Sequence, residues 1–445
     1  MMESLSENSP KRLPMNRRKF LHQTTATTLL STVAGSVSLS KAKAAANDRI
    51  TIGVIGVGKQ GVSDFVKTMK FPQTQMVAMC DVVAERRENG KKIANDFYAK
   101  LNNEPNYDGV SVHEDFREVT GRDDIDAVMV VTPDHWHAIP VVAAAKAGKD
   151  IYCEKPISRT IAEGRAMVNA VQANKVVFQT GSQQRSEYDG KFRIAAELVR
   201  NGKIGEVISV NIGIGDPNVP CDLPAEEVPE GTNWDLWLGP APMRPYNEIL
   251  CPKGVHNHFP RWRLYREYAG GMVADFGAHH FDIAQWGLGT DDTGPVRLVP
   301  PQDDDAKRGM MLEYANGVKM FHGGPGGTTF VGTSGVVSVD RSRLETIPAD
   351  LREKNPIGED GTKLENAGGR NGYSHVANWL ENIESRGKCI CHEEIGHRTA
   401  SICHITNIAY QLRKELNWDP KTEQFDDAEA NQLVDQEMRG EWKLA

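Results

Sequence analysis

The chain has 445 residues, of which 39% are hydrophobic and 25% charged, and its formal net charge at pH 7 is −8. This length exceeds that of one ordinary domain, so an ordinary globular composition predicts at least two domains. After the N-terminal region the sequence contains no basic run, which argues against a nucleic-acid partner. The seven cysteines are odd in number and scattered, so they indicate no disulfide framework.

Residues 1–46 have the organisation of a targeting segment. Arg17 and Arg18 are adjacent, and Phe20-Leu21, a weakly apolar stretch (24–39) and small-residue cleavage sites follow. This order resembles a Tat signal peptide, which would take the folded protein out of the cytoplasm through the Tat machinery. We therefore expect a periplasmic or otherwise exported protein. A disordered basic arm is the alternative.

From Asn47 to about Gly181, β-rich runs alternate with helical segments, which predicts a parallel sheet with helices on both faces. In such sheets, ligands bind beyond the carboxyl ends of the strands. The expected strands after the first are residues 76–80, 125–131, 150–153 and 176–180. The expected helices are residues 62–69, 84–101, 138–147 and 161–173.

The first expected strand, residues 51–55, leads directly into Gly56-Val57-Gly58-Lys59-Gln60-Gly61. Gly56 allows a tight turn, Gly58 lets the backbone approach a pyrophosphate, and Gly61 lets the helix pack close to the strand. The phosphates would then bind N–H groups at the helix N-terminus. An ordinary glycine-rich turn without a nucleotide is the alternative.

Asp81 ends the second expected strand, where an acidic residue can bind both ribose hydroxyls of NAD. Its charge would repel the 2′-phosphate of NADP, which favours NAD. The nearby Arg86 and Arg87 could weaken this preference, so NADP is the alternative cofactor. Because no free nicotinamide pool is expected outside the cytoplasm, an exported enzyme should load this cofactor before export and hold it tightly.

Two further polar motifs follow expected strands: Thr132-Pro133-Asp134-His135-Trp136-His137 and Glu154-Lys155-Pro156. Pro156 disfavours helix at Lys155, so the lysine is held extended at the sheet edge. A lysine beside a nicotinamide can hydrogen-bond a substrate oxygen and help to move its proton. The alternative is a surface turn in which Glu154 is only an ion-pair partner.

A third motif runs from Gly270 to Trp286, with Asp275, His279 and Asp282 at helical spacing. Asp275 and His279 would share one face, so the carboxylate could orient an imidazole that accepts a hydroxyl proton. The alternatives are a helix cap beside a core histidine, or a metal site that includes His280. Adjacent histidines point about 100° apart on a helix, so we predict no metal.

Together these motifs resemble those of the Gfo/Idh/MocA family of sugar oxidoreductases, over nearly all of the expected mature chain. The family's Thr-Pro-Asn-x-x-His is present with Asp134 in place of asparagine, and its Glu-Lys-Pro is unchanged. Its Gly-Gly-x-x-x-Asp-x-Gly-x-His-x-x-Asp pattern spans Gly270 to Asp282.

The resemblance implies an α/β fold: a Rossmann domain (47–181), then an α+β domain (182–445) whose open, mostly antiparallel sheet usually forms dimers or tetramers. It implies that Lys155 orients the substrate and relays a proton, that Asp275 binds the substrate, and that His279 is the base. The expected cofactor contacts are Gly56, Gly58, Lys59, Gln60, Gly61, Asp81, Thr132, Pro133, Asp134, His137, Glu154 and Lys155. The expected substrate contacts are Arg185, Trp262, Arg263 and Asp275.

Later segments specify less. Residues 192–200 predict an amphipathic helix, 323–335 predict turns between strands, and 417–442 predict a helix packed on the first domain. The aromatic stretches at 234–240 and 258–263 resemble carbohydrate-facing loops, although core packing is the commoner use of aromatic residues. Cys389-Ile390-Cys391-His392 does not have the spacing of a zinc finger.

We expect an NAD(P)-dependent oxidoreductase that acts on a hydroxyl of a sugar, polyol or sugar derivative. The alternatives are a redox-neutral glycosidase or lyase that oxidises its substrate transiently, and a coupled sugar oxidoreductase. Both would recycle a tightly bound cofactor. A sugar-binding protein with a vestigial nucleotide site is the non-enzyme alternative, against which Lys155, Asp275 and His279 argue.

Overall fold

The structure is a computed structural model, and it describes residues 49–354, 361–365 and 374–444. The predicted Tat segment, residues 1–46, lies outside the described residues. Within these described ranges, no helix has the length and apolar character needed to cross a membrane.

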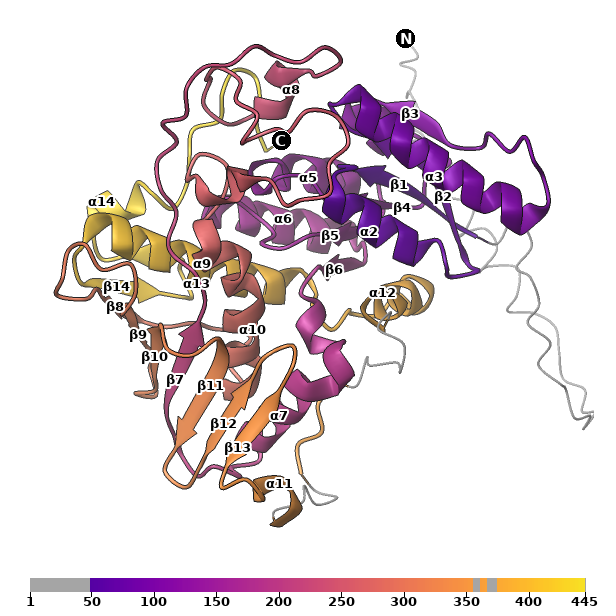
Figure 1. The fold of residues 1–445 in the computed structure, drawn as a ribbon. Coiled ribbons are helices and arrows are strands. Elements are labelled where there is room, and N and C mark those ends of the chain that lie inside the picture. Colours follow the sequence, from indigo (N-terminus) through magenta and orange to yellow (C-terminus); the bar gives the residue numbers. More distant parts are fainter. Residues whose placement is uncertain (1–48, 355–360, 366–373, 445) are drawn as a thin grey trace, which may run out of the picture. The chain divides into compact units, whose positions relative to one another are not determined.

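The first sheet has six strands in the described part of the chain, ordered β3-β2-β1-β4-β5-β6 (Figure 1). Every neighbouring pair is parallel, as the alternating pattern predicts. The central strands are apolar and buried on both faces, which is typical of a parallel sheet. The bounds are β1 Ile50–Ile55, β2 Thr74–Cys80, β3 Ser111–His113, β4 Ala127–Val130, β5 Asp150–Cys153 and β6 Phe178–Thr180.

Helices pack on both faces of this sheet. The helices fall into two groups, each with its own hydrophobic cluster against the sheet. One cluster contains side chains of α2, α3 and α12, which lies far along the sequence, and the other contains side chains of α4, α5 and α6. All four predicted helices of this region are present, and α2 begins earlier than predicted, at Lys59. The bounds are α2 Lys59–Thr68, α3 Ala84–Asn102, α4 Phe116–Thr120, η2 Asp134–Trp136, α5 Ala138–Lys146, α6 Ile161–Asn174 and α12 Ser374–Ser385.

The second sheet has nine strands among the described residues, ordered β13-β12-β11-β7-β10-β9-β8-β14-β15. Only the β7–β10 pair is parallel, so the sheet is open and mostly antiparallel, as predicted. The bounds are β7 Val207–Gly213, β8 Arg297–Val299, β9 Met311–Glu313, β10 Lys319–His322, β11 Gly327–Gly332, β12 Val336–Val339, β13 Leu344–Ile347, β14 Leu416–Asp419 and β15 Gln424–Phe425.

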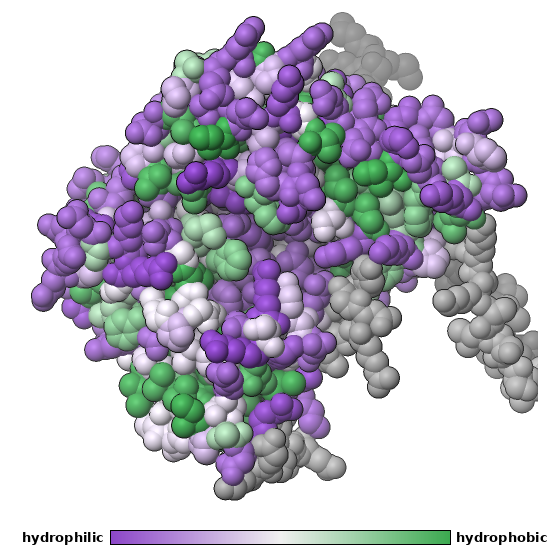
Figure 2. Space-filling model, in the orientation of Figure 1, coloured by the Kyte–Doolittle hydropathy of each residue, from purple (hydrophilic) through white to green (hydrophobic). Residues whose placement is uncertain are grey.

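One face of this sheet packs against α7 (Lys191–Arg200), α10 (Gly277–Leu288) and α13 (Glu393–Leu412). Helix α7 confirms the helix predicted at 192–200. Figure 2 shows hydrophobic side chains gathered over the lower part of the same domain. The remaining described elements are η3 Gln183–Arg185, η4 Tyr188–Gly190, α8 Trp234–Leu238, η5 Arg261–Leu264, α9 Gly271–Asp275, α11 Leu351–Lys354 and α14 Ala428–Asn431.

Two predictions about the second domain are wrong in part. Residues 323–335 contain the strand β11 as well as turns, because the run from Thr328 to Val331 pairs with β7 and β12. Residues 417–442 form no long helix, since β14 pairs with β8 and only α14 is helical there. The packing of this segment on the first domain is confirmed: the ring of Trp442 lies 4.9 Å from that of Trp136.

Candidate active site

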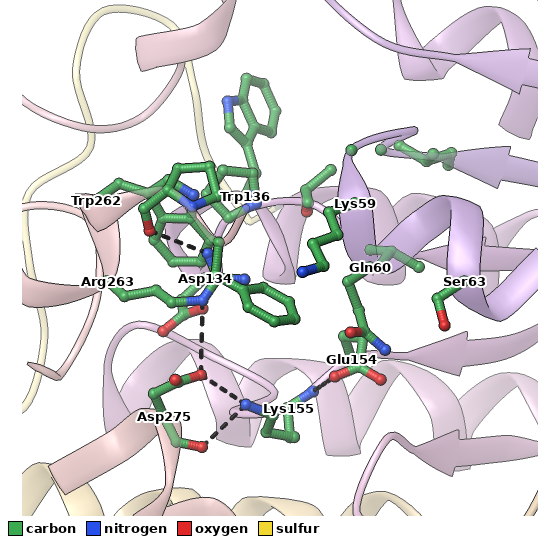
Figure 3. Close-up of a pocket in the computed structure, with 18 of the residues that line it drawn as sticks. Lys59, Gln60, Ser63, Asp134, Trp136, Glu154, Lys155, Trp262, Arg263 and Asp275 are labelled. Atoms are coloured by element: carbon green, nitrogen blue, oxygen red, sulfur yellow. Dashed lines mark hydrogen bonds and ion pairs between the residues drawn. The ribbon is translucent and has the colours of Figure 1, made fainter. Parts of the chain in front are cut away.

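A cavity of about 570 Å³ lies at the carboxyl ends of the parallel strands and is lined from both domains (Figure 3). The structure therefore brings most of the predicted site residues together. The wall includes Gly56, Gly58, Lys59, Gln60, Asp81, Thr132, Pro133, Asp134, Glu154, Lys155, Trp262, Arg263, Asp275 and His279. Gly61, His137 and Arg185 are not among its lining residues.

The glycine turn at the end of β1 has the shape that a dinucleotide needs. A Cβ atom at Gly56, whose φ is +93°, would lie 2.5 Å from the Val131 carbonyl oxygen, and one at Gly61 would lie 2.1 Å from the Gly56 oxygen. A Cβ at Gly58 would meet no atom within 4 Å, so it would point into open space. Helix α2 starts there without a side-chain cap, so its N-terminus can accept an anion.

Asp81 lies beside this turn at the end of β2. Its Oδ2 accepts a hydrogen bond from the Val57 N–H (2.9 Å), and its Oδ1 accepts one from the Val83 N–H (2.9 Å). Arg86 and Arg87 both donate to backbone carbonyls: Arg86 to Gly254 (2.9 Å) and Arg87 to Asp81 itself (2.9 Å). The carboxylate is thus fixed on the cavity wall, as a ribose-binding group should be.

Residues 231–264 of the second domain form a covering segment over this side of the cavity. The Asn233 N–H donates to the Val82 carbonyl (3.0 Å), and Arg86 holds the Gly254 carbonyl. Lys59, the first residue of α2, donates to the Asn257 carbonyl (3.1 Å), and its ammonium lies 4.3 Å from the centre of the Phe259 ring. The segment therefore closes over the glycine turn and the Asp81 region together.

Lys155 and Asp275 form an ion pair between the two domains (Figure 3). Lys155 Nζ lies 2.6 Å from Asp275 Oδ1 and 2.9 Å from its backbone oxygen, and Arg263 Nε lies 3.7 Å from the same carboxylate. Burial opposes charge on Asp275, but the two cations outweigh it and hold its pKa below the ordinary value. The lysine thus keeps a fixed position at the cavity wall.

His279 lies on α10, is 4% exposed, and faces the same cavity. Burial first, then the charges of Lys155 and Arg341, lower its pKa well below the ordinary value, so the imidazole is neutral at pH 7. Its Nδ1 has no hydrogen-bond partner among the described residues. A neutral imidazole on the cavity wall can accept a proton.

The predicted pairing of Asp275 with His279 is wrong. The helix is interrupted, because α9 ends at Asp275 and α10 begins at Gly277. The Asp275 carboxylate binds Lys155 and Arg263, two cations from outside this motif. The periodicity of one segment could not indicate these partners.

Asp134, which replaces the family's asparagine, is a buried carboxyl on the cavity wall. No hydrogen bond or ion pair of its side-chain oxygens is found in the described ranges. Burial and then the nearby Asp275 charge raise its pKa well above the ordinary value, although Arg263 and Lys155 act in the opposite direction. Burial therefore favours the protonated form of this carboxyl, which can donate a hydrogen bond.

His137 lies behind the wall rather than on it. Its ring nitrogens contact the Pro156 carbonyl (2.8 Å) and the Thr132 carbonyl (2.9 Å). The ring therefore links the turn after β4 to the Glu-Lys-Pro turn that carries Lys155. In this position it supports the site and does not face the cofactor cleft directly.

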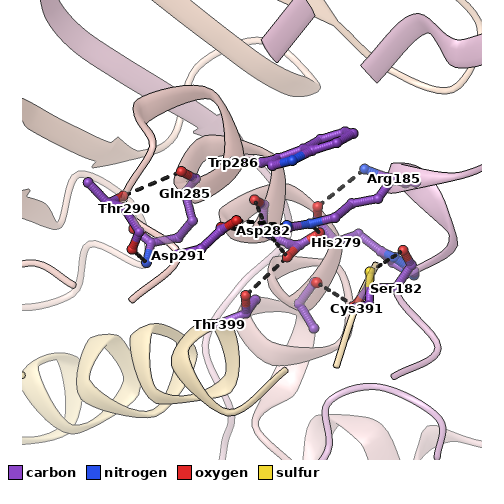
Figure 4. Close-up of polar contacts among 12 residues, drawn as sticks. Ser182, Arg185, His279, Asp282, Gln285, Trp286, Thr290, Asp291, Cys391 and Thr399 are labelled. Atoms are coloured by element: carbon purple, nitrogen blue, oxygen red, sulfur yellow. Dashed lines mark hydrogen bonds and ion pairs between the residues drawn. The ribbon is translucent and has the colours of Figure 1, made fainter. Parts of the chain in front are cut away.

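Arg185 does not belong to the cavity wall, so its prediction as a substrate contact is not supported. It is 2% exposed, and its guanidinium binds Asp282 (2.7 and 2.9 Å) and Asp291 (2.7 and 2.9 Å), as Figure 4 shows. Thr399 donates to the same Asp282 carboxylate (3.3 Å). These acidic partners lie far along the sequence and occupy the arginine's donors.

Several cavity residues were not predicted from the sequence: Lys67, Glu187, Tyr188, Phe276 and Arg341 line the wall near His279. They come from separate helices and turns, and of the five only Phe276 falls within a motif, at a position that the motif leaves variable. Among the described residues, no group of three or more His, Cys, Asp or Glu side chains is arranged to hold a metal. The Cys391 thiol instead contacts the Ser182 carbonyl (3.5 Å).

A glycine turn on a parallel sheet, facing a lysine, an aspartate and a neutral histidine, defines the class of nicotinamide-dependent oxidoreductases. Two family models match the chain: "Oxidoreductase family, NAD-binding Rossmann fold" over residues 50–182, and "Oxidoreductase family, C-terminal alpha/beta domain" over residues 219–444. The chain belongs to the Gfo/Idh/MocA family of oxidoreductases, and its first domain is an NAD-binding Rossmann domain.

Relatives of the chain are named for different compounds. The chain is 31% identical to the myo-inositol 2-dehydrogenase of Thermotoga maritima over 169 residues (38% of this chain, 46% of the relative). It is 35% identical to the levoglucosan dehydrogenase of Pseudarthrobacter phenanthrenivorans over 176 residues (39% and 36%). These matches span less than half of either dehydrogenase. A longer match, 25% over 310 residues (68% and 71%), is to the 2,7-anhydro-N-acetylneuraminate hydratase of Mediterraneibacter gnavus.

Solved structures share the fold. An oxidoreductase domain protein from Kribbella flavida matches with a TM-score of 0.56 at 18% identity, over 83% of this chain and 99% of the other. Levoglucosan dehydrogenase in complex with NADH and levoglucosan matches with a TM-score of 0.52 at 18% identity, again over 83% and 99%. At these identities the likeness shows the fold alone, and it confirms the predicted architecture.

Proposed function

We propose that this protein is an NAD-dependent oxidoreductase that oxidises a hydroxyl of a sugar, polyol or sugar derivative. The observation that carries the proposal is the meeting of Lys155, Asp275 and His279 on the cavity that begins at the glycine turn. Two relatives named as dehydrogenases of myo-inositol and levoglucosan support this substrate class.

The proposed chemistry divides between the cofactor and the side chains. An oxidised nicotinamide, held by the glycine turn and Asp81, would supply the hydride acceptor. Lys155, fixed by Asp275, donates a hydrogen bond to the substrate oxygen and holds the carbinol carbon in place. His279 accepts the hydroxyl proton as the C–H hydrogen leaves as hydride, so the carbon–oxygen bond becomes a carbonyl.

The direct test loads the purified protein with NAD, offers a panel of sugars and polyols, and follows the absorbance of the reduced nicotinamide. We expect His279→Ala to lower turnover by about 10²- to 10⁴-fold, the usual contribution of a general base, while NAD affinity stays within about threefold. Unchanged turnover in this variant would refute the assignment of His279 as the base. A wild-type protein that does not bind NAD would refute the proposal as a whole.

We further propose that the cofactor is NAD rather than NADP and that it is retained. Asp81 on the cavity wall disfavours a 2′-phosphate, and the covering segment closes over the glycine turn. Protein purified without added cofactor should release stoichiometric NAD(H) on denaturation, which chromatography would identify. An empty protein that binds NAD weakly would contradict retention.

A redox-neutral reaction is the second candidate, in which the substrate is oxidised transiently and the cofactor is regenerated. The covering segment favours it, because a retained cofactor must be recycled in place, and one relative is named as a hydratase. The two candidates differ in the amount of NADH formed per molecule of product. Net oxidation forms one NADH with each product, whereas the redox-neutral reaction forms product with no gain of NADH. A stoichiometric gain of NADH would exclude the second candidate.

Export and assembly are also proposals. Residues 1–46 would direct Tat export, and replacing Arg17 and Arg18 with lysine should then keep the protein in the cytoplasmic fraction. We propose a dimer or tetramer that forms through the outer face of the second sheet, where Phe321 and Val331 are half-buried. Light scattering after size exclusion tests this assembly, and a monomer at all concentrations would contradict it.

A further inference from the structure

One end of the cavity holds a guanidinium, that of Arg341, for which the described ranges show no ion pair with a carboxylate. Arg341 lies in the turn between β12 and β13, and its guanidinium carbon is 5.1 Å from the centre of the Tyr188 ring and 5.5 Å from that of Phe276. Its Nε donates to Gln184 Oε1 (3.2 Å). No ion pair of Arg341 is found among the described residues, whereas Arg343 in the same turn pairs with Asp340 (2.9 Å).

The two aromatic residues beside Arg341 are Tyr188, which has a rare backbone conformation, and Phe276, which is exposed. Tyr188 has φ +61° and the next residue, Asp189, has φ +57°, a backbone conformation that side-chain-bearing residues seldom adopt and that clusters at binding sites. Phe276 is 39% exposed and lies at the junction between α9 and α10. The structure therefore keeps both rings against the cation and leaves a ring face accessible from the cavity.

This group adjoins the proposed catalytic histidine. The Phe276 and His279 rings lie 6.2 Å apart, and all of these residues line the same cavity. Lys67 adds a second cation at this end, also without an ion pair among the described residues. The acidic neighbour is Glu187, and burial raises the pKa of its carboxyl to about 7 against the opposing charges of Lys67 and Arg341.

We propose that Arg341, between Tyr188 and Phe276, binds an anionic group of the substrate, a carboxylate or a phosphate, while the reacting hydroxyl lies at His279. A guanidinium presents parallel N–H donors that match either anion, and partial burial strengthens such charge-assisted bonds. The inference rests on the proposed function, because it takes the cavity to be the sugar site. It narrows the substrate class from sugars in general to acidic sugars.

The test is calorimetric titration of the NAD-loaded protein with matched ligands: glucuronate, galacturonate and glucose 6-phosphate against glucose and galactose. We expect an acidic ligand to bind at least about tenfold more tightly than its neutral parent. Arg341→Gln should weaken that acid by about 10- to 100-fold and leave the neutral sugar within about threefold. Comparing the affinities of the two uronates with that of glucose 6-phosphate shows whether the site prefers a carboxylate or a phosphate.

Two variants serve as controls. Arg341→Lys keeps the positive charge but loses the parallel N–H donors of the guanidinium. Its affinity for the acidic ligand should therefore lie between those of wild type and Arg341→Gln. Arg343→Gln removes an ion-paired arginine that does not line the cavity, so it should leave the affinities for acidic and neutral ligands unchanged. Acid binding no tighter than neutral binding, no acid binding at millimolar concentration, or an unchanged affinity in Arg341→Gln would overturn the inference.

The NAD titration of each variant separates this inference from the function on which it rests. If wild type fails to bind NAD, the proposed function is wrong. If NAD binds with wild-type affinity in Arg341→Gln while acidic and neutral sugars behave alike, only the anion site is wrong. Retained NAD affinity also shows that the variant is folded.

Discussion

Asp134 and Asp275 show how the pKa of one residue type shifts in opposite directions on the same cavity wall. Burial raises the pKa of Asp134, which has no cation in contact, whereas Lys155 and Arg263 overcome burial at Asp275 and lower its pKa. The sequence identified both positions, but the charge states depend on side chains from other segments. The tertiary contacts therefore decide in which direction the pKa of each carboxyl shifts.

These two shifts predict opposite pH dependences of stability. A raised folded-state pKa means that stability is fully present below the unfolded pKa, near 4, and is lost as the pH rises through the folded value. Asp134→Asn should therefore gain stability over wild type at pH 8 and lose that gain at pH 4. Each unit of pKa shift corresponds to about 1.4 kcal/mol.

Asp275→Asn is the matched control with the reverse sign. Its lowered pKa gives stability that is present above the unfolded pKa and lost as the pH falls through the folded value. This variant should be less stable than wild type at pH 8, with the difference shrinking at low pH. Urea unfolding at both pH values checks the pair, and parallel pH dependences would contradict the assigned charge states.

At the scale of elements, the covering segment and the glycine turn belong to different domains but build one side of the cavity. The sequence predicted the glycine turn from its motif, whereas it indicated only aromatic loops at 234–240 and 258–263. Trp237 and Trp262 do line the cavity, and Trp237 also stacks on Trp234 with ring centres 4.7 Å apart. Core packing and cavity lining thus coexist in the same residues.

Because the covering segment lies over the glycine turn and the Asp81 region, we expect the cofactor to dissociate slowly. Phe259 contacts the Lys59 ammonium at 4.3 Å and the Arg263 guanidinium at 5.2 Å, so Phe259→Ala removes two cation–π contacts. We expect NAD to dissociate about 3- to 30-fold faster, since such contacts contribute about 0.5–2 kcal/mol. Met243→Ala, at an exposed position of the same segment, is the control. Stopped-flow fluorescence measures both rates, and equal rates would argue against the segment's role.

At the scale of the whole molecule, the junction between the two sheets fixes His279 relative to the glycine turn. Arg185 follows β6 and binds Asp282, which lies on the same helix as His279. The Thr180 N–H at the end of β6 also donates to the Cys391 carbonyl (2.8 Å). These contacts make Arg185 important for geometry although it does not face the cavity.

Removing this arginine should destabilise the protein strongly. Arg185→Met leaves Asp282 buried without its cation, and breaking a buried pair in this way costs about 3–5 kcal/mol. Arg117→Gln, which breaks a surface pair with Asp115, should cost no more than about 1 kcal/mol. Denaturant unfolding compares the two variants. Similar losses would mean that the buried network contributes no more than a surface ion pair.

The sequence by itself determined the parallel sheet, the dinucleotide turn and the residues Lys155, Asp275 and His279. It did so because glycine spacing, strand periodicity and turn chemistry act within short stretches of chain. Only the tertiary structure decided that Asp275 pairs with Lys155 instead of orienting His279, that Arg185 is a buried structural residue, and that Arg341 faces the cavity. All three outcomes depend on contacts between segments more than 90 residues apart, and no local pattern encodes such contacts.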